Sequence, residues 1–309
     1  MRNAFAKALT ETAAARDDVV LLSGDIGNRL FDPFKERCPD RFINCGVAEA
    51  NMIGVAAGMA MSGLRPVAYT IVPFLTSRCL EQIRVDLCYQ RQPVVLVGVG
   101  GGLSYASLGG THHACEDIAL LRALPEMSVL CPGDALEVPG ALAAALAHDG
   151  PVYVRLGKKG EAVVHDAEPE VALGGSITVR SGDDVALLAV GNLLPLACEA
   201  AADLEREGIG ARVESMVSVK PLDEGMLEEV FATCRAVVVV EEHSRIGGAG
   251  AAVAQWSVDR REPVRARLAC VATPDAFFHE AGSQAYARER LGLTPQAVAT
   301  AAREAMAAR

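Results

Sequence analysis

The segment Phe42–Gly63, FINCGVAEANMIGVAAGMAMSG, and the run Pro66–Thr70, PVAYT, which follows it, decide the fold class. A short run headed by Phe42 and Ile43 leads into a stretch of small and apolar residues that is long enough for a helix. A second apolar run comes directly after that stretch. Strands that alternate with helices in this way are typical of a sheet that is covered on both faces. The segment therefore predicts a strand–helix–strand unit.

The same alternation continues along the first half of the chain. A first amphipathic helix is expected at the N-terminus, where Phe5 and Leu9 are four residues apart. Because the apolar runs are nearly continuous, we expect them to form a parallel sheet with helices on both faces. The expected strands are Val19–Leu22, Phe42–Asn44, Pro66–Thr70, Pro93–Val97, Met127–Leu130 and Val152–Arg155, and the expected helices are Ala48–Ser62, Leu75–Tyr89 and Ala135–His148.

A polar stretch divides the chain into two parts. Between Gly157 and Leu173 the sequence loses its periodicity, so we expect a linker at residues 158–172. The predicted fold class is α/β, with one domain at residues 1–157 and a smaller one at residues 173–309. The second domain is expected to contain Val185–Val190, Ala211–Met216, Ala236–Val240 and Val264–Cys270 as strands and Pro195–Glu207, Leu222–Phe231 and Gly250–Asp259 as helices.

Composition excludes several classes of protein. With 51% hydrophobic residues in 309, the chain has material for a large core and is not a disordered protein. A net charge of −10 argues against a partner such as nucleic acid or an anionic membrane surface. No apolar run reaches the roughly 18 residues that span a bilayer. The nine cysteines include no CxxC pair, which indicates reduced thiols and a cytoplasmic protein.

Glu49 is the first candidate for chemistry. It stands in the first turn of the predicted helix Ala48–Ser62, where the helix dipole and free N–H groups favour a carboxylate. The alternative is that Glu49 only caps this helix, while Gly54 and Gly58 let a second helix approach closely.

The glycine run VGVGGGLSYASLGG, residues 97–110, resembles a dinucleotide-binding loop but lacks its spacing. Leu103 and Tyr105 stand where G-x-G-x-x-G requires its last glycine. The second cluster, Gly247–Gly250, has Val253 at the corresponding position. A Rossmann cofactor is therefore not expected, although a loop at the end of such a strand is where α/β sheets place ligands.

Other polar residues follow predicted strands. His112 and His113 have no metal-ligand spacing to another His or Cys, so we expect no metal ligands there. One of them could contact a ligand, or both could form a surface pair. Arg155 could clamp a phosphate or carboxylate, or it could form an interdomain ion pair. The cluster Glu241–His243 could serve a site or lie at an interface.

An ordered set of motifs resembles the C-terminal half of transketolase, as it occurs when that enzyme is split into two subunits. The match covers nearly the whole chain. Its segments are SGDIGN (23–28), FINCGVAEANMIGVAAGMAMSG (42–63), PVAYTIVPFLTSRCLEQIRVD (66–86), THHACEDIALLRALPEMSVLCPGD (111–134), HDGPVYVRLGK (148–158), KPLDEGML (220–227) and VVVVEEHSRIGGAGAAV (237–253).

The resemblance implies two three-layer α/β domains, a pyrimidine-binding domain with a parallel sheet and a smaller, mixed-sheet transketolase C-terminal domain. It implies that Glu49 is the catalytic glutamate that hydrogen-bonds the aminopyrimidine ring of thiamine diphosphate. Phe74 matches the aromatic residue that stacks on this ring, and Asp25 an acidic residue near the thiazolium charge. His112 matches a catalytic and substrate-binding histidine, and Arg155 the arginine that holds a substrate phosphate. The implied reaction moves a two-carbon ketol unit from a ketose to an aldehyde.

The family binds the diphosphate through Mg²⁺ with a GDG motif that is missing here. The Gly-Asp pairs of this chain, in SGDIG, PGDAL and SGDDV, are not followed by glycine. The resemblance therefore implies a separate N-terminal subunit that carries the GDG motif and holds Mg²⁺, in an α₂β₂ heterotetramer.

Several positions depart from the family pattern. Ser77 and Leu80 replace aromatic residues, Gly100 stands in place of a histidine, and Ser107-Leu108 replaces Glu-Asp. A site without these polar groups should discriminate hydroxylated substrates less strictly. We therefore expect a specialised sugar or secondary-metabolite pathway, with Arg155 keeping an anionic substrate possible. Two alternatives stay open: the beta subunit of a 2-oxoacid dehydrogenase's decarboxylating component, and a non-catalytic partner subunit.

Overall fold

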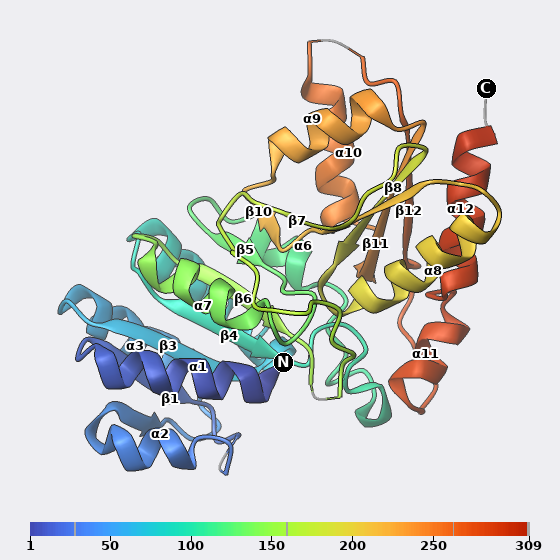
Figure 1. Ribbon diagram of the computed structural model, residues 1–309. Helices are drawn as coiled ribbons and strands as arrows, with labels where there is room; N and C mark the ends of the chain where they lie inside the picture. The colour runs from blue at the N-terminus through green and yellow to red at the C-terminus, as the bar shows by residue number, and fades with distance from the viewer. Residues whose placement is uncertain (28, 159, 262, 308–309) are drawn as a thin grey trace.

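A seven-stranded sheet forms the centre of the first half of the protein in the computed structural model, which describes residues 1–27, 29–158, 160–261 and 263–307. Its strand order is β10-β5-β6-β4-β3-β1-β2 (Figure 1). Neighbouring strands are parallel except at one edge, where β10 pairs antiparallel with β5. The strands are β1 (Val19–Ser23), β2 (Phe42–Asn44), β3 (Arg65–Ile71), β4 (Val95–Val99), β5 (Ser128–Leu130), β6 (Val152–Leu156) and β10 (Ser218–Lys220).

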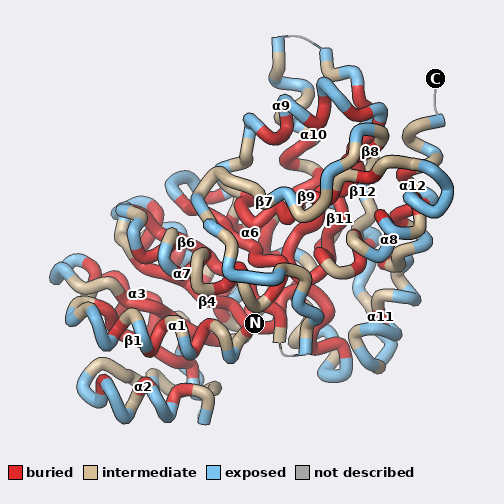
Figure 2. Tube along the Cα trace, viewed as in Figure 1, coloured by how far each residue is buried: buried red, intermediate tan, exposed pale blue. Residues whose placement is uncertain are grey.

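Helices cover both faces of this sheet because successive strand residues point to opposite sides. Val19 and Leu21 of β1 pack with α1, α2 and α7, whereas Val20 and Leu22 pack with α3, α4, η2 and α6. Figure 2 shows the strands buried between these layers. The helical segments are α1 (Arg2–Ala15), α2 (Asp32–Arg37), η1 (Pro39–Arg41), α3 (Glu49–Met61), α4 (Val72–Leu75), α5 (Leu80–Gln82), the π-helical η2 (Ile83–Tyr89), η3 (Ala106–Leu108), α6 (Asp117–Arg122) and α7 (Val138–Ala147).

A five-stranded sheet of order β12-β11-β8-β9-β7 forms the second half, with β7 antiparallel and the other strands parallel. Helices α8 and α12 cover one face, and α9 and α10 cover the other. The strands are β7 (Ile177–Arg180), β8 (Val185–Val190), β9 (Ala211–Ser215), β11 (Ala236–Ser244) and β12 (Arg267–Thr273), and the helices are η4 (Gly191–Leu193), α8 (Leu194–Arg206), α9 (Glu224–Thr233), α10 (Ala249–Asp259), α11 (Gln284–Arg290) and α12 (Pro295–Ala307).

The two halves share one hydrophobic core. A single cluster of buried side chains contains Met52 of α3, Leu121 of α6, Leu188 of β8 and Val239 of β11. Strand β10, which follows β9 in the chain, joins the sheet of the first half. Each half therefore contributes to the stability of the other.

The expected α/β fold is confirmed, although several observed elements, such as α2, β7 and α12, were not expected. The single helix expected at Leu75–Tyr89 is divided: the end of α4 is followed by a turn at residues 76–79, then by α5 and the π-helical η2. The first sheet is not purely parallel as expected. Strand β10, which was not expected in this sheet, pairs antiparallel with β5 at its edge. Among the described residues no helix is long and apolar enough to cross a membrane.

Candidate functional site

The carboxyl ends of β1, β3, β4 and β6 meet at one edge of the first sheet, because these neighbouring strands run parallel. Gly24 and Asp25 follow β1, Phe74 follows β3, the loop that begins at Gly100 follows β4, and Lys158 follows β6. The candidate residues from distant parts of the sequence are therefore gathered at the edge where open α/β sheets bind ligands.

Glu49 begins α3 with a side chain that is only 2% exposed. Its Oε2 accepts a hydrogen bond from Nη1 of Arg78 at 2.5 Å. In the described part of the chain, no N–H group of α3 donates to this carboxylate, so the contacts do not support the interpretation of Glu49 as a helix cap. The buried carboxylate is instead paired with the exposed Arg78 at the edge of the sheet.

Gly24 and Thr70 pack closely around Glu49. A Cβ on Gly24 would lie 2.9 Å from Oγ1 of Thr70 and 3.2 Å from Cγ of Glu49, so a larger residue would crowd both side chains. Oγ1 of Thr70 is buried and has no hydrogen-bond partner among the described residues. An orphaned hydroxyl beside a buried carboxylate is costly in an empty fold and is typical of a binding site.

Phe74, His112 and Tyr105 form a row of rings, and Arg78 connects its Phe74 end to Glu49. The ring centroids of Phe74 and His112 are 5.2 Å apart, and those of Tyr105 and His112 are 6.1 Å apart. A cation lies at each end of the row: the Arg78 guanidinium is 4.4 Å from the Phe74 centroid, and Nζ of Lys158 is 4.7 Å from the Tyr105 centroid. The row thus links the buried carboxylate to a positively charged rim.

His112 is half-buried, and burial together with the neighbouring His113 lowers its pKa. The imidazole is therefore neutral at pH 7. Its Nδ1 lies 2.9 Å from Oγ1 of Thr111, which leaves Nε2 for a ligand. His113 instead directs Nε2 to the carbonyl oxygen of Ala106, at 3.2 Å. The two histidines do not point at a common partner.

Asp25 is exposed and adopts a left-handed backbone conformation with φ 57°. Nδ2 of Asn44 donates to its Oδ1 at 2.9 Å, and Oδ1 of Asn44 accepts from the backbone N–H of Gly46 at 3.0 Å. These bonds connect the loop after β1 to the loop before α3. Asp25 therefore lies at the same edge as Glu49 with its carboxylate facing solvent.

Arg155 is 4% exposed and forms a buried ion pair with Asp117. Its Nε donates to Oδ2 of Asp117 at 2.8 Å, and its Nη2 donates to Oδ1 at 3.2 Å. Nη2 also donates to the carbonyl oxygens of Ala114, at 2.9 Å, and of Glu242 in the second half, at 3.0 Å. The ion pair lies within the first half, and the hydrogen bond to Glu242 connects Arg155 to the second half, so these contacts agree only in part with the alternative of an interdomain ion pair.

The cluster Glu241–His243 also lies at the contact between the halves and is fully buried. Glu241 accepts from the N–H groups of Ala249 and Gly250 at the start of α10, and His243 accepts from the N–H of Ala119 in α6. The second glycine run is needed here, because a Cβ on Gly248 would overlap Oε2 of Glu241. The cluster therefore belongs to the interface between the two halves, where His243 contacts α6.

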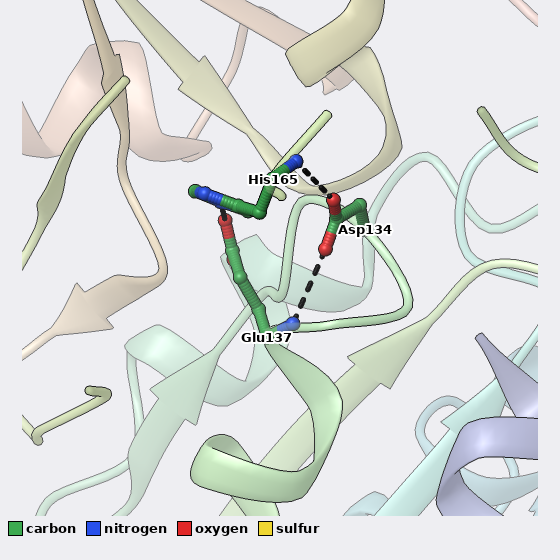
Figure 3. Close-up of side chains that lie close together, drawn as sticks. All are labelled: Asp134, Glu137 and His165. Carbon is green, nitrogen blue, oxygen red and sulfur yellow. Dashed lines mark hydrogen bonds and ion pairs between the residues drawn. The ribbon is translucent and has the colours of Figure 1, made fainter. Parts of the chain in front are cut away.

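Asp134, Glu137 and His165 are near enough to one another to hold a metal ion, but their ligand atoms are already in use. Nε2 of His165 lies 2.8 Å from Oε1 of Glu137. Asp134 accepts hydrogen bonds from the backbone N–H groups of Glu137 and His165, as Figure 3 shows. Oε2 of Glu137 accepts from the N–H of Gly133 at 2.6 Å. We interpret this trio as a clasp that fastens the linker to the start of α7.

Three site residues were missed from the sequence. Arg78 and Lys158 both lie within the quoted family segments, but only their positions beside Phe74 and Tyr105 single them out. Asp117, the partner of Arg155, precedes an apolar run in CEDIALL and had only the signal of an ordinary helix start.

Comparison with known proteins agrees with this architecture. Residues 1–160 match the family model of the transketolase pyrimidine binding domain, and residues 174–298 match that of the transketolase C-terminal domain. The fold thus consists of two α/β domains that match the two domain models of this family. The chain belongs to the transketolase family.

Relatives of similar length include proteins named as transketolase subunits. One subunit of the apulose-4-phosphate transketolase of Phocaeicola vulgatus is 35% identical over 85% of each chain. The 6-deoxy-6-sulfo-D-fructose transketolase subunit SqwH of Clostridium sp. is 36% identical over 98% of this chain and 94% of its own. A solved structure titled "Split gene transketolase, inactive beta4 tetramer" superposes with a TM-score of 0.89 at 36% identity, over 99% of this chain and 97% of that one.

Proposed function

We propose that this chain is the C-terminal subunit of a two-component, transketolase-like enzyme that uses thiamine diphosphate. The enzyme would transfer a two-carbon ketol unit from a ketose to an aldehyde. The observation that carries the proposal is the buried Glu49 carboxylate beside the Phe74 ring at the carboxyl edge of the first sheet. The names of the relatives, which are subunits of transketolases, support it.

The residues around Glu49 fit the aminopyrimidine ring of this cofactor. A flat ring with an amino group needs an aromatic face, a buried acceptor and further polar contacts. Phe74 offers the face, Glu49 the carboxylate, and Thr70 a buried hydroxyl without a partner among the described residues. Gly24 lets Glu49 and Thr70 lie close to the backbone, since a Cβ there would crowd both side chains.

When bound, thiamine diphosphate supplies a nucleophilic carbon that carries the two-carbon unit. Glu49 would hold a proton between its carboxylate and a nitrogen of the pyrimidine ring, and burial strengthens that hydrogen bond. Phe74 would orient the ring by stacking. The exposed carboxylate of Asp25 would face the positive thiazolium.

His112 and Lys158 would contact the substrate. The neutral His112 can exchange a proton with a substrate oxygen through Nε2, since its Nδ1 faces Thr111. Lys158, held over Tyr105, would attract a terminal anion. Arg155 was expected to hold that anion, but its Nε and Nη2 already donate to Asp117 and to two carbonyl groups. We therefore assign the anion to Lys158 and give Arg155 the role of fixing the loop beneath the site.

The substrate is proposed to be a sugar outside central metabolism. Gly100, where the family usually has a histidine, has φ 88°, and a Cβ there would overlap the Tyr105 ring. Tyr105 thus closes the space that the missing side chain would need. The names of two relatives contain a phosphorylated and a sulfo sugar, which supports an anion-bearing ketose here as well.

We propose that a second, N-terminal subunit completes the enzyme. This subunit would carry the GDG motif, hold Mg²⁺ and the diphosphate, and assemble with the present chain as an α₂β₂ heterotetramer in the cytoplasm. The Gly-Asp pairs of the present chain lack the last glycine of that motif, which supports the assignment of Mg²⁺ and the diphosphate to a second subunit.

The role of Glu49 is tested with Glu49→Gln in the reconstituted pair. Glutamine keeps the size of the side chain but cannot share a proton as a carboxylate does. We expect two-carbon transfer to fall by about 10²-fold or more, while the thermal stability of the isolated chain stays near that of the wild type.

A control variant for this test is Glu207→Gln, which removes an exposed partner of Arg303 and should leave turnover unchanged. Full turnover by Glu49→Gln with saturating cofactor would overturn the assignment. Release of carbon dioxide from pyruvate by the wild-type pair, without two-carbon transfer to an aldehyde, would favour a 2-oxoacid dehydrogenase subunit instead.

A further inference from the structure

Arg78 lies between the two residues that the proposed function assigns to the aminopyrimidine ring. Its guanidinium carbon is 4.4 Å from the centroid of Phe74, and its Nη1 donates to Oε2 of Glu49 at 2.5 Å. The Arg78 side chain is 43% exposed, whereas that of Glu49 is 2% exposed. The guanidinium therefore reaches from solvent into the place where the ring would bind.

The guanidinium and the aminopyrimidine ring are chemically similar enough to compete for the same position. Both are flat and delocalised, both carry N–H donors in their plane, and both stack on an aromatic face. The face of Phe74 that holds Arg78 accommodates one flat group at a time. Both groups would also donate to the same Glu49 carboxylate, whose Oε2 already accepts from Arg78.

We propose that Arg78 occupies the aminopyrimidine position in the cofactor-free chain and leaves it when thiamine diphosphate binds. This inference rests on the proposed function. Arg78 is then a built-in competitor that lowers the apparent affinity for the cofactor, because only the fraction of molecules with Arg78 displaced can bind.

The local structure permits this movement. Arg78 belongs to the turn at residues 76–79 between α4 and α5, and its backbone N–H donates to the carbonyl oxygen of Pro73 at 3.2 Å. The backbone is thus held in place while the long side chain can rotate into solvent. Since the side chain already lies partly in water, its release exposes little apolar surface.

The contact between Arg78 and Glu49 also stabilises the chain without cofactor. Glu49 is buried, and a buried carboxylate without a partner destabilises a fold strongly. Arg78 neutralises this charge until the cofactor replaces it. Arg78 therefore both competes with the cofactor and stabilises the site when no cofactor is bound.

The test compares thiamine diphosphate binding by the wild-type and Arg78→Ala chains, each reconstituted with the N-terminal subunit and Mg²⁺, in calorimetric titrations. If Arg78 competes, Arg78→Ala should bind about threefold to tenfold more tightly, which corresponds to one cation–π contact and one half-exposed ion pair. Arg303→Ala, which removes an exposed partner of Glu207, should bind like the wild type.

A second variant and a second measurement keep the test decisive. Arg78→Lys keeps the charge but not the flat face, so its Kd should lie between those of the wild type and Arg78→Ala. In the isolated chain, Arg78→Ala should lower the Tm, because Glu49 loses its partner. If Arg78→Ala does not fold, Arg78→Lys alone must still bind more tightly than the wild type.

Equal or weaker binding by the variants, with normal binding by the wild-type pair, would overturn the inference and show that Arg78 supports the bound cofactor. If the wild-type pair itself does not bind thiamine diphosphate, the proposed function fails, and the inference fails with it. The two failures are thus distinguishable by the wild-type titration.

Discussion

Arg155 and Asp117 form the most deeply buried ion pair of the site region, with side chains 3% and 1% exposed. Although burial opposes the charge of both groups, each stabilises the charged form of the other. As a result the pKa of Asp117 is lowered and that of Arg155 is raised. Tyr153 donates to Oδ2 of Asp117 at 2.6 Å and completes its hydrogen bonding. This pair joins β6, α6 and the second half of the chain.

We predict that Arg155→Ala lowers the free energy of unfolding by about 3–5 kcal/mol, because Asp117 is left as a buried charge without its partner. Denaturant titration monitored by circular dichroism measures this change. Adding Asp117→Asn to the variant should recover part of the loss, since the uncompensated charge is removed. Normal stability of Arg155→Ala, together with a raised KM for an anionic substrate, would instead favour substrate binding by Arg155.

For single residues, the sequence could identify the residue types of the site but not the partners of those residues. The resemblance pointed to Glu49, Phe74 and His112, and the structure brings Phe74 and His112 into contact. The partner of Arg155 is 38 residues away in the chain, so an anion-binding arginine and an ion-paired arginine have the same sequence pattern. Burial decides between them, and it emerges only when β6 and α6 pack together.

Among the elements, the clasp of Asp134, Glu137 and His165 has a clear dependence on pH. The hydrogen bond to Glu137 is the main cause that raises the pKa of His165. A histidine whose pKa is raised by folding stabilises the fold fully below its unfolded value, near 6.5, and this contribution disappears as the pH rises through the folded pKa. The clasp should therefore hold the linker more firmly at acidic pH.

We predict that the wild type exceeds His165→Gln in free energy of unfolding at pH 6, and that this difference shrinks by pH 8.5. Glutamine can still donate to Glu137 but carries no charge, so the comparison isolates the charge of His165. Urea titrations of both proteins at the two pH values measure it. A difference that is independent of pH would show that the charge of His165 does not contribute.

Strands with strong apolar patterns were predictable, and so were the short strands β2 and β5. The buried strands β1, β3, β4 and β6 were expected close to their observed bounds because both of their faces are covered. The π-helical η2 and the edge strand β10 have no such periodicity, since their geometry depends on what they pack against.

For the whole molecule, the shared core and β10 make the two halves one stable unit. The site lies at an edge of this unit, where Asp25 and Arg78 are exposed. We therefore expect a second subunit to supply the metal and diphosphate contacts. From the sequence, only the family resemblance could indicate this partner, because composition and length are equally consistent with a complete two-domain enzyme.

The need for a second subunit is tested most directly by a calorimetric titration of thiamine diphosphate with Mg²⁺ into this chain alone and into this chain with its N-terminal subunit. We expect tight binding by the pair and at least a hundredfold weaker binding by the chain alone, about 2.7 kcal/mol, because the diphosphate contributes to affinity only when the metal is held. Binding by the isolated chain that is as tight as that of the pair would contradict the proposed division of the cofactor site.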